Sequence, residues 1–163
     1  MPLRYPPRSS REGRRSRERE GGHTLKISTR TDYGIRAMLE LAKQYGRGPV
    51  QSHDIATNQD IPEPYLNQLL TQLRKAGLIT SRRGPGGGHC LARPANEITV
   101  AELITALEGS LWPSEDGTEP RRSCHSLQEL LQELYQQTEQ VLRSCSLADL
   151  LERERRRAYV YHI

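Results

Sequence analysis

The sequence predicts a mainly α-helical chain that contains one small two-stranded β hairpin. Leucines recur at helical spacing between residues 66 and 73, a basic and glycine-rich stretch continues to Leu91, and a second leucine repeat runs from Leu127 to Leu142. Apolar residues three and four positions apart line one face of a helix. A glycine cluster between two short apolar runs is typical of the turn in a hairpin. Helices therefore dominate the expected fold, and one hairpin interrupts them.

Composition and cysteine content restrict the class of protein. The 163 residues are 34% hydrophobic and include no Phe and one Trp. This predicts one domain, or one domain with an extension, and a thin core that self-association would enlarge. No apolar run reaches the roughly 18 residues of a membrane span, and no secretory signal is present, so a cytoplasmic protein is expected. The three cysteines, Cys90, Cys124 and Cys145, are far apart, which fits a reducing compartment.

Two helices are expected before the main leucine repeat, at residues 28–45 and 51–59. The first ends at the glycines and proline of residues 46–49, which stop a helix. Ser52 is the expected N-cap of the second, shorter helix. The apolar positions at helical spacing are Ile35, Met38, Leu39 and Ala42 in the first helix, and Ile55 and Ala56 in the second.

A third helix, from residue 63 to residue 76, has two chemically different arcs. One arc is apolar, and the opposite arc carries amides, a hydroxyl and a cation. Asp60, with Glu63 three residues later, is the expected entry signal, and Gly77 is the expected left-handed cap at the exit. The arcs consist of Leu66, Leu69, Leu70 and Leu73 on the apolar side, and Asn67, Gln68, Thr71, Gln72 and Lys75 on the polar side.

The hairpin after this helix is basic at its base and rich in glycine at its tip. Residues 78–83 are expected to form the outgoing strand, and residues 89–92 the returning strand. The glycines between them do not match a nucleotide-binding loop, because His89 and Cys90 stand where such a loop needs Lys followed by Ser or Thr.

The polar arc and the hairpin together favour a DNA-binding surface. Asn and Gln can hydrogen-bond adenine edges, Arg can bind guanine or phosphate, and glycines let backbone approach a sugar-phosphate wall. The alternative is a solvent-exposed helix face beside an ordinary hairpin, and Arg82 and Arg83 favour DNA over it. The candidate contacts are Asn67, Gln68, Thr71, Arg74, Lys75, Arg82, Arg83, Gly86 and Gly87.

Residues 66–94, LNQLLTQLRKAGLITSRRGPGGGHCLARP, resemble the recognition helix and wing of the Rrf-type family of bacterial regulators, the IscR/NsrR-like proteins. The similarity runs from about residue 25 to residue 151. It implies a winged helix-turn-helix followed by a long C-terminal dimerisation helix. It also implies a sequence-specific DNA-binding transcriptional regulator that acts as a homodimer and as a repressor at a palindromic operator.

The resemblance also assigns individual DNA contacts. Pro62, Pro64 and Asn67 depart from the residues of some relatives, which implies a different operator. Positions that contact DNA in relatives are occupied here by Ser52, Tyr65, Asn67, Gln68 and Arg83.

The expected domain layout has three parts. Residues 25–97 form the DNA-binding domain, and residues 98–163 supply a bracing helix, a loop and the dimerisation helix. Residues 1–24 have almost no apolar content and are expected to be disordered. This extension carries the whole excess of positive charge, because residues 1–20 hold seven Arg and three Glu of a chain whose net charge is +4. It is either a basic arm that follows DNA phosphates or the product of a mis-called start, since relatives begin near Leu25.

The C-terminal half is expected to brace the wing and to join two subunits. Thr99 and Glu102 form a capping box that starts a helix ending at Gly109. Residues 127–142 then repeat close to a heptad, which is typical of a helix that meets a partner helix, and the resemblance identifies it as the dimerisation helix. Its apolar seam is Leu127, Leu130, Leu131, Leu134, Val141 and Leu142. Residues 146–151 resemble the closing element of the family.

Cluster-binding relatives carry three cysteines in the loop that corresponds to residues 110–123. Here only Cys124 remains, followed by His125, whereas a [2Fe-2S] cluster needs four ligands. One interpretation joins Cys124 and His125 to Asp32 from the partner subunit in an unusual cluster site that responds to iron-sulfur or redox status. The favoured interpretation is a chain without a cofactor. Such a regulator would respond to another signal, for example by binding a metabolic enzyme or another protein, and no enzyme motif is present.

Overall fold

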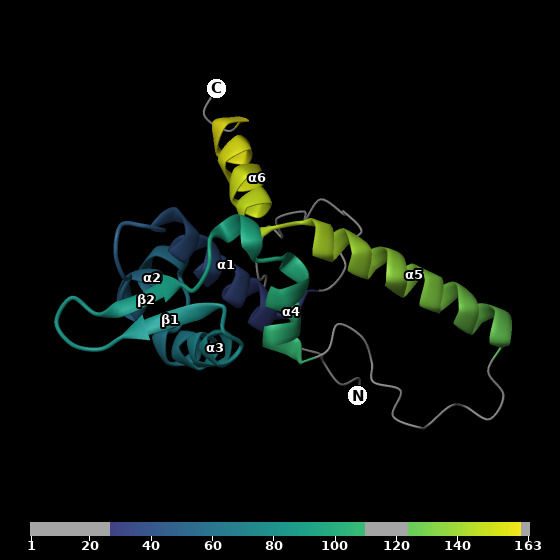
Figure 1. Cartoon of the computed structure of the whole chain (residues 1–163), viewed down its shortest axis with the longest axis horizontal. Coiled ribbons are helices and arrows are strands. Elements are labelled where there is room, and N and C mark those ends of the chain that lie inside the picture. Colours follow the sequence, from purple (N-terminus) through teal and green to yellow (C-terminus); the bar gives the residue numbers. More distant parts are fainter. Residues whose placement is uncertain (1–26, 110–123, 161–163) are drawn as a thin grey trace, which may run out of the picture.

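The chain folds into a helical body with one hairpin, from which two helices extend (Figure 1). The computed structural model describes residues 27–109 and 124–160, so the extension at residues 1–24 and the loop at residues 110–123 lie outside the described residues. The described elements are α1 (Thr29–Lys43), α2 (Ser52–Gln59), α3 (Glu63–Lys75), β1 (Ile79–Arg82), β2 (Gly88–Leu91), the 3-10 helix η1 (Ala95–Glu97), α4 (Val100–Glu108), α5 (His125–Ser144) and α6 (Leu147–Val160). The predicted fold class, mainly α with a two-stranded β wing, is confirmed.

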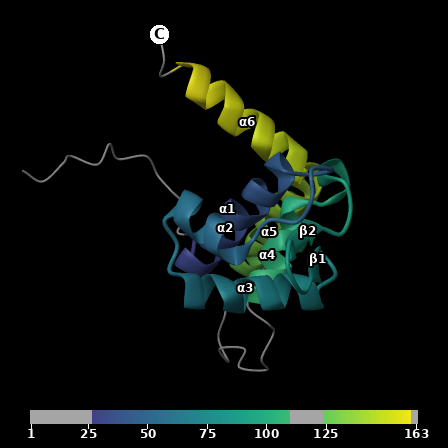
Figure 2. The ribbon, with the colours of Figure 1, turned by 90° about the vertical axis from the view of Figure 1, so that its left-hand side faces the viewer.

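The apolar faces of α1, α2, α3 and α4 meet in one core. α3 packs against the other three helices, and Figure 2 shows it along one edge of the body, with α6 leaving from the opposite edge. Burying one aliphatic side chain of this size contributes about 1.5–3 kcal/mol. The four leucines of the predicted apolar arc are all buried, namely Leu66, Leu69, Leu70 and Leu73.

The prediction for the start of α3 is wrong, whereas the prediction for its end is confirmed. Asp60 is not its entry cap; it ends α2 in the left-handed conformation, with φ 51°. α3 begins after Pro62, which provides no side-chain cap, and Pro64 lies in the first turn, where backbone N–H groups have no helical partner. At the other end, Gly77 has φ 72°, which is the predicted left-handed exit.

The hairpin is tied to the segment that leads into α2. Its strands deviate from the expected bounds by one residue at each end, and their register places Arg82 opposite Gly88. The Val50 N–H donates to the His89 carbonyl at 2.9 Å, and the His89 N–H donates to the Val50 carbonyl at 2.8 Å. A Cβ at Gly88 would lie 2.4 Å from the Val50 carbonyl oxygen. Only glycine therefore allows the wing to approach this segment so closely.

α4 begins at the predicted capping box. The Thr99 hydroxyl accepts from the Glu102 N–H at 3.2 Å, and the Glu102 carboxylate accepts from the Thr99 N–H at 2.8 Å. Thr99 also forms an antiparallel bridge with Ser146, between α5 and α6. The start of α4 therefore holds the C-terminal helices on the body.

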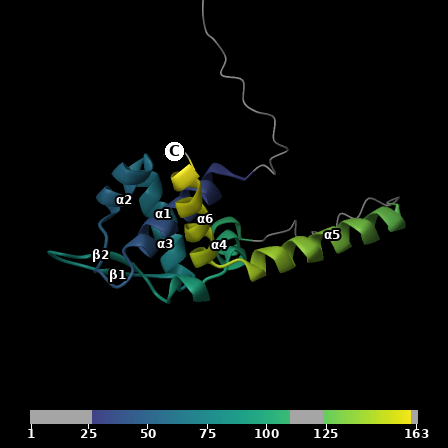
Figure 3. The ribbon, with the colours of Figure 1, turned by 90° about the horizontal axis from the view of Figure 1, so that it is seen from above.

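α5 projects from the body and exposes its apolar seam. Figures 1 and 3 show that it extends away from the other elements, and its end packs against α4. None of its residues is buried. Apolar stripes of this kind mark surfaces that meet another molecule. Leu142 is half-buried, and the other seam residues are exposed by 38–64%, namely Leu127, Leu130, Leu131, Leu134 and Val141.

α6 extends further than the closing element expected at residues 146–151. Leu147 and Leu151 are buried, whereas residues 152–158 are exposed. The Arg156 guanidinium pairs with Glu152 one turn earlier, at 3.2 Å, which supports the exposed part of the helix. No helix in the described residues has both the length and the apolarity needed to cross a membrane.

Gly34 marks a close approach between α1 and α4. A Cβ at this position would lie 2.4 Å from Leu107 Cδ1, and Leu107 is buried. We expect Gly34→Ala to lower the free energy of unfolding by about 1–3 kcal/mol, because overpacking outweighs the roughly 0.5–1 kcal/mol that Ala gains over Gly in a helix. Urea denaturation measures this change. In a Leu107→Ala background, which removes the contact, the same substitution should instead raise the free energy of unfolding by about the 0.5–1 kcal/mol of the helix preference; equal destabilisation in both backgrounds would refute the packing explanation.

Candidate nucleic-acid interface

The exposed face of α3 carries amides, a hydroxyl and two cations. Asn67, Gln68, Thr71, Arg74 and Lys75 are all exposed and follow the helical repeat on the side away from the buried leucines. The Thr71 hydroxyl donates to the Asn67 backbone carbonyl at 2.8 Å, so it lies along the helix. The two amides and the two cations are therefore the groups that α3 offers to a ligand.

Gln72 does not belong to this exposed face, although the sequence places it on the polar arc. It is half-buried, and its Oε1 is buried without a hydrogen-bond partner among the described residues. Gln72 follows Leu69 by three positions, so it lies on the same side of the helix as that core residue. The predicted polar arc is therefore narrower than expected.

Four exposed cations adjoin this face. Arg74 and Lys75 end α3, Arg82 ends β1 and Arg83 follows it, and all four are exposed. Among residues 27–109 and 124–158, none of them forms an ion pair. A cation at a helix C-terminus also complements the helix dipole, so Arg74 and Lys75 stabilise α3 as well. Unpaired positive charge beside exposed amides suits a phosphate backbone.

Tyr65, a predicted DNA contact, is anchored on α1. Its ring meets Tyr33 edge to face, with centroids 5.9 Å apart, and the Arg36 guanidinium lies 5.4 Å from the centre of the Tyr33 ring. Aromatic pairs of this kind contribute about 0.5–1.5 kcal/mol. Tyr65 is half-buried, so it holds the first turn of α3 in place while part of its side chain stays accessible.

Ser52 is not the N-cap of α2; it is the first helical residue, and Gln51 occupies the cap position without a side-chain bond. The Ser52 hydroxyl instead lies 3.1 Å from His89 Nε2, and the Ser81 hydroxyl lies 2.9 Å from His89 Nδ1. Burial, followed by the positive charge of Arg74, lowers the pKa of His89, because both disfavour the charged ring. A neutral imidazole therefore connects α2 with the wing.

Sequence reasoning assigned no contact to His89, which the structure places between α2 and the wing. Its partners Ser52 and Ser81 are 37 and 8 positions away, and no local spacing joins the three. The only signal in the sequence is a polar ring between the glycine-rich turn and an apolar strand end.

The two glycines predicted to approach DNA have different surroundings. A Cβ at Gly86 would meet nothing within 4 Å, whereas a Cβ at Gly87 would lie 2.3 Å from the Arg82 carbonyl oxygen. Gly86 therefore stands at an open tip. Gly87 is required by the packing of the hairpin itself.

Polar side chains of α1 hold α2 in place. The Glu40 carboxylate accepts from Asn58 Nδ2 at 3.1 Å and from Gln59 Nε2 at 2.9 Å, and it pairs with Lys43 at 3.3 Å. Arg36 donates to the backbone carbonyl of Gln59 at the end of α2. Burial raises the pKa of Glu40, but the hydrogen bonds from Gln59, Asn58 and Lys43 outweigh it, so the pKa lies below its usual value.

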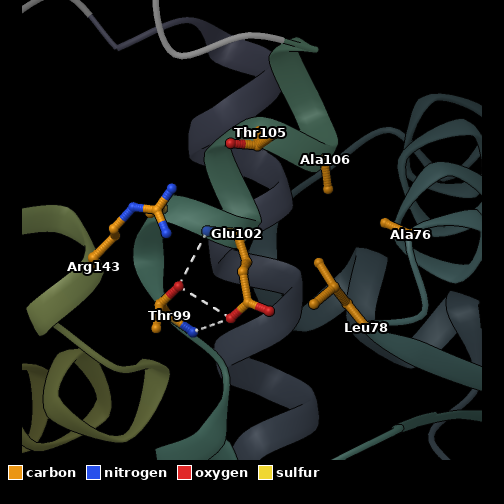
Figure 4. A pocket seen from close by; sticks show the side chains of 8 residues that line it. Ala76, Leu78, Thr99, Glu102, Thr105, Ala106 and Arg143 are labelled. Atoms are coloured by element: carbon orange, nitrogen blue, oxygen red, sulfur yellow. Dashed lines mark hydrogen bonds between the residues drawn. The ribbon is translucent and has the colours of Figure 1, made fainter. Parts of the chain in front are cut away.

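A cavity of about 350 Å³ lies between the end of α3, α4 and the end of α5 (Figure 4). Its charged groups are satisfied within the chain, because Glu102 pairs with Arg93 and Arg143 pairs with Glu139, both at 2.7 Å. Nothing therefore marks it as a ligand site. Its lining residues are Ala76, Leu78, Thr99, Ala101, Glu102, Thr105, Ala106 and Arg143.

The candidate cluster ligands do not form a complete set in one chain. Asp32 pairs with Arg36 at 3.4 Å on α1, while Cys124 and His125 begin the projecting α5, where His125 pairs with Glu129 at 3.3 Å. Among the described residues, no three His, Cys, Asp or Glu side chains lie together as metal ligands would. The sequence of residues 110–123 contains no Cys or His. Cys124 and His125 therefore supply one thiolate and one imidazole from one chain, two of the four ligands that a [2Fe-2S] cluster needs.

The helix-turn-helix, its exposed amide face and its basic wing define a winged-helix protein of the DNA-binding class. Comparison with known families then places it more closely. The Rrf2 family model, described as an iron-dependent transcriptional regulator, matches residues 27–153. The chain belongs to this family, which confirms the resemblance found in the sequence.

Individual relatives include proteins named CymR and IscR. The CymR regulator of Bacillus subtilis strain 168 is 39% identical over 128 residues, which cover 77% of this chain and 89% of that protein. IscR of Photorhabdus laumondii is 44% identical over 87 residues, which cover 53% of each chain. Among solved structures, CymR of B. subtilis, the global cysteine regulator, superimposes with a TM-score of 0.70 at 38% identity over 79% of this chain and 98% of that chain. The structure of T. potens IscR superimposes with a TM-score of 0.69 at 40% identity, over 82% of this chain and 91% of that chain.

Glu40 makes the stability of the helix-turn-helix depend on pH. Its pKa is depressed below 4.5 in the folded chain, so its contribution to stability is present above that value and is lost as the pH falls through the folded-state pKa. We expect Glu40→Gln to lower the free energy of unfolding by about 1–2 kcal/mol at neutral pH. The difference from wild type should shrink in acid.

Urea denaturation at neutral and acidic pH tests this expectation. Glu97→Gln, on the exposed surface of η1, serves as the matched control and should change little at either pH. A Glu40→Gln deficit of equal size at both pH values would contradict the role given to the carboxylate charge.

Proposed function

We propose that this Rrf2-family regulator acts as a homodimeric repressor that binds a palindromic DNA operator. The observation that carries the proposal is the exposed face of α3, where Asn67 and Gln68 stand beside Arg74 and Lys75, with the basic wing next to them. Base edges in a major groove present donor and acceptor pairs that suit amides, and the flanking phosphates suit the cations.

The proposed division of labour follows from the chemistry of each side chain. Asn67 and Gln68 would contact base edges, and the four cations and the open tip at Gly86 would contact phosphates or the minor groove. Ser52, which opens α2, would donate to a phosphate. Sequence preference then depends on the two amides, whereas affinity depends mainly on the cations.

Dimerisation supplies the second reading helix. The exposed seam of α5 is an apolar stripe close to a heptad repeat, and two copies would bury it against each other. A twofold axis at this contact would place two copies of α3 in successive major grooves, with half-sites about 34–36 Å apart or slightly more. Repression needs nothing further, because a dimer bound over a promoter excludes other proteins from it.

Arg83→Ala tests the wing contact. We expect operator affinity to fall by more than about tenfold, the size of a good charged contact, and the salt dependence of binding to decrease by about one unit of slope. The duplex is first selected from genomic fragments bound by the wild-type protein, and affinity is then measured by gel shift at several salt concentrations.

Arg155→Ala is the matched control, because Arg155 is exposed on α6, and this helix leaves the body at the edge opposite α3 (Figure 2). It should bind the operator as wild type does. Unchanged affinity in Arg83→Ala would remove the wing from the interface. Binding that does not weaken as salt rises would instead favour docking to a protein partner.

Leu134→Glu tests the dimer. This residue is 56% exposed in the single chain, so the substitution should leave the body folded. In the dimer, however, it would bury one carboxylate from each subunit at the seam, and the cost of burying these charges would separate the subunits. Sedimentation velocity should show a shift from dimer to monomer, and operator affinity should fall by at least about tenfold, since one half-site contact is lost.

Gln136→Glu adds the same charge to α5 at an exposed position outside the seam and should remain dimeric. A Leu134→Glu protein that still sediments as a dimer would show that α5 does not form the interface.

A further inference from the structure

Every hydrogen-bonding group of His89 has a partner: three of them reach the segment around α2, and one reaches the neighbouring strand of the wing. Its ring nitrogens lie 3.1 Å from the Ser52 hydroxyl in α2 and 2.9 Å from the Ser81 hydroxyl in β1. Its backbone N–H and carbonyl both bond to Val50, just before α2, at 2.8 and 2.9 Å. No group of this residue is left over for DNA, so any effect on DNA binding must act through its neighbours.

The protonation of the ring decides what the two serines can do. Burial and Arg74 lower the pKa of His89, so one ring nitrogen donates and the other accepts. If Nε2 carries the proton, it donates to Ser52 Oγ, Ser81 donates to Nδ1, and the Ser52 hydroxyl proton is free. If Nδ1 carries the proton, Ser52 must donate to Nε2, and its proton is used inside the protein.

We propose that His89 is a positioning residue for DNA binding, which holds the wing against α2 and, protonated on Nε2, leaves the Ser52 hydroxyl free to donate to a DNA phosphate. The inference rests on the proposed function, because it requires duplex DNA against α2 and the wing. Ser52 is half-exposed and is the first residue of α2, where the helix dipole also favours a phosphate.

The neighbours of the ring support this arrangement. Gly88 allows the backbone contact with Val50, since a Cβ there would lie 2.4 Å from the Val50 carbonyl oxygen. Arg74 is the charged group whose field acts on the ring, and it is itself exposed on α3 for a phosphate contact. One ring therefore lies at the meeting point of three elements that would face the duplex.

The test compares three substitutions that keep different parts of the ring. Gln places its amide near the Nε2 position and can still donate to Ser52, whereas Asn places its amide near Nδ1 and reaches only Ser81. Leu reaches neither serine. Fluorescence anisotropy with the selected operator should show affinity about tenfold weaker for His89→Leu and His89→Asn, and within about threefold of wild type for His89→Gln.

A double-mutant cycle shows whether His89 acts through Ser52. Ser52→Ala should weaken binding by about tenfold, and adding His89→Leu should cause little further loss. Ser144→Ala, an exposed serine of α5, is the matched control and should bind as wild type does. Additive losses in the double variant would overturn the proposal.

Two further measurements separate positioning from a general loss of structure. The salt dependence of binding should stay at the wild-type slope in the His89 variants, because a hydroxyl donor carries no charge, whereas Arg83→Ala lowers the slope. Nitrogen NMR of the imidazole should show the Nε2–H tautomer in the DNA complex. A predominant Nδ1–H tautomer would overturn the proposal, even if His89→Leu does not fold.

The outcomes for this inference and for the proposed function are distinct. Operator binding that depends on Arg83 but is unaffected by all three His89 variants would overturn the positioning role and leave the regulator intact. Failure of the wild-type protein to select any DNA sequence would overturn the proposed function, and the positioning role with it.

Discussion

The orientation of the exposed amide face of α3 depends on one constraint, the burial of the leucine face of this helix against α1, α2 and α4. Leu66, Leu69, Leu70 and Leu73 are all buried, so the rotation of α3 about its axis is set by the core. Turning the helix by one residue, about 100°, would expose some of these side chains at about 1.5–3 kcal/mol each. The amides of Asn67 and Gln68 therefore face outward before any ligand is present.

The core determines the orientation of α3, whereas polar contacts determine the positions of α2 and the wing beside it. Glu40 and Arg36 hold α2 by its C-terminal end, through Asn58 and Gln59. The wing is held at its base through Val50, by backbone bonds that need the small size of Gly88. Apolar burial is nondirectional, while hydrogen bonds have preferred geometry. The angle between wing and helix-turn-helix therefore depends on the polar contacts more than on the core.

Features with a local cause were predictable from the sequence. The helices follow from apolar periodicity, the cap at Gly77 from its freedom to take positive φ, and the capping box from Thr99 and Glu102. Asp60 was misassigned because the same residue type ends one helix in the left-handed region and begins another, and local sequence does not separate these roles. Gln72 was misassigned because a two-arc division is too coarse for a residue at the edge of the core.

Features that join distant parts of the chain were not predictable in this way. The contacts of Glu40 with α2 and of His89 with Ser52 span 18 to 37 positions, and each exists only once the core has brought the helices together. The DNA contacts and the dimer seam came from side-chain chemistry and family resemblance. They involve a duplex and a second chain, so they stay predictions.

The length of α5 has a further consequence for how this protein can change during evolution. α5 runs as 20 continuous helical residues from its outer end to the body. A change in its length would therefore alter both the distance and the orientation of the body relative to the seam. In a dimer joined at the seam, one residue inserted between the seam and the body would turn each DNA-binding domain by about 100°. Seven inserted residues would turn it by only about 20° and lengthen the arm by about 10 Å. Insertions and deletions in this arm should therefore accumulate in whole heptads, while the loops around it vary freely in length.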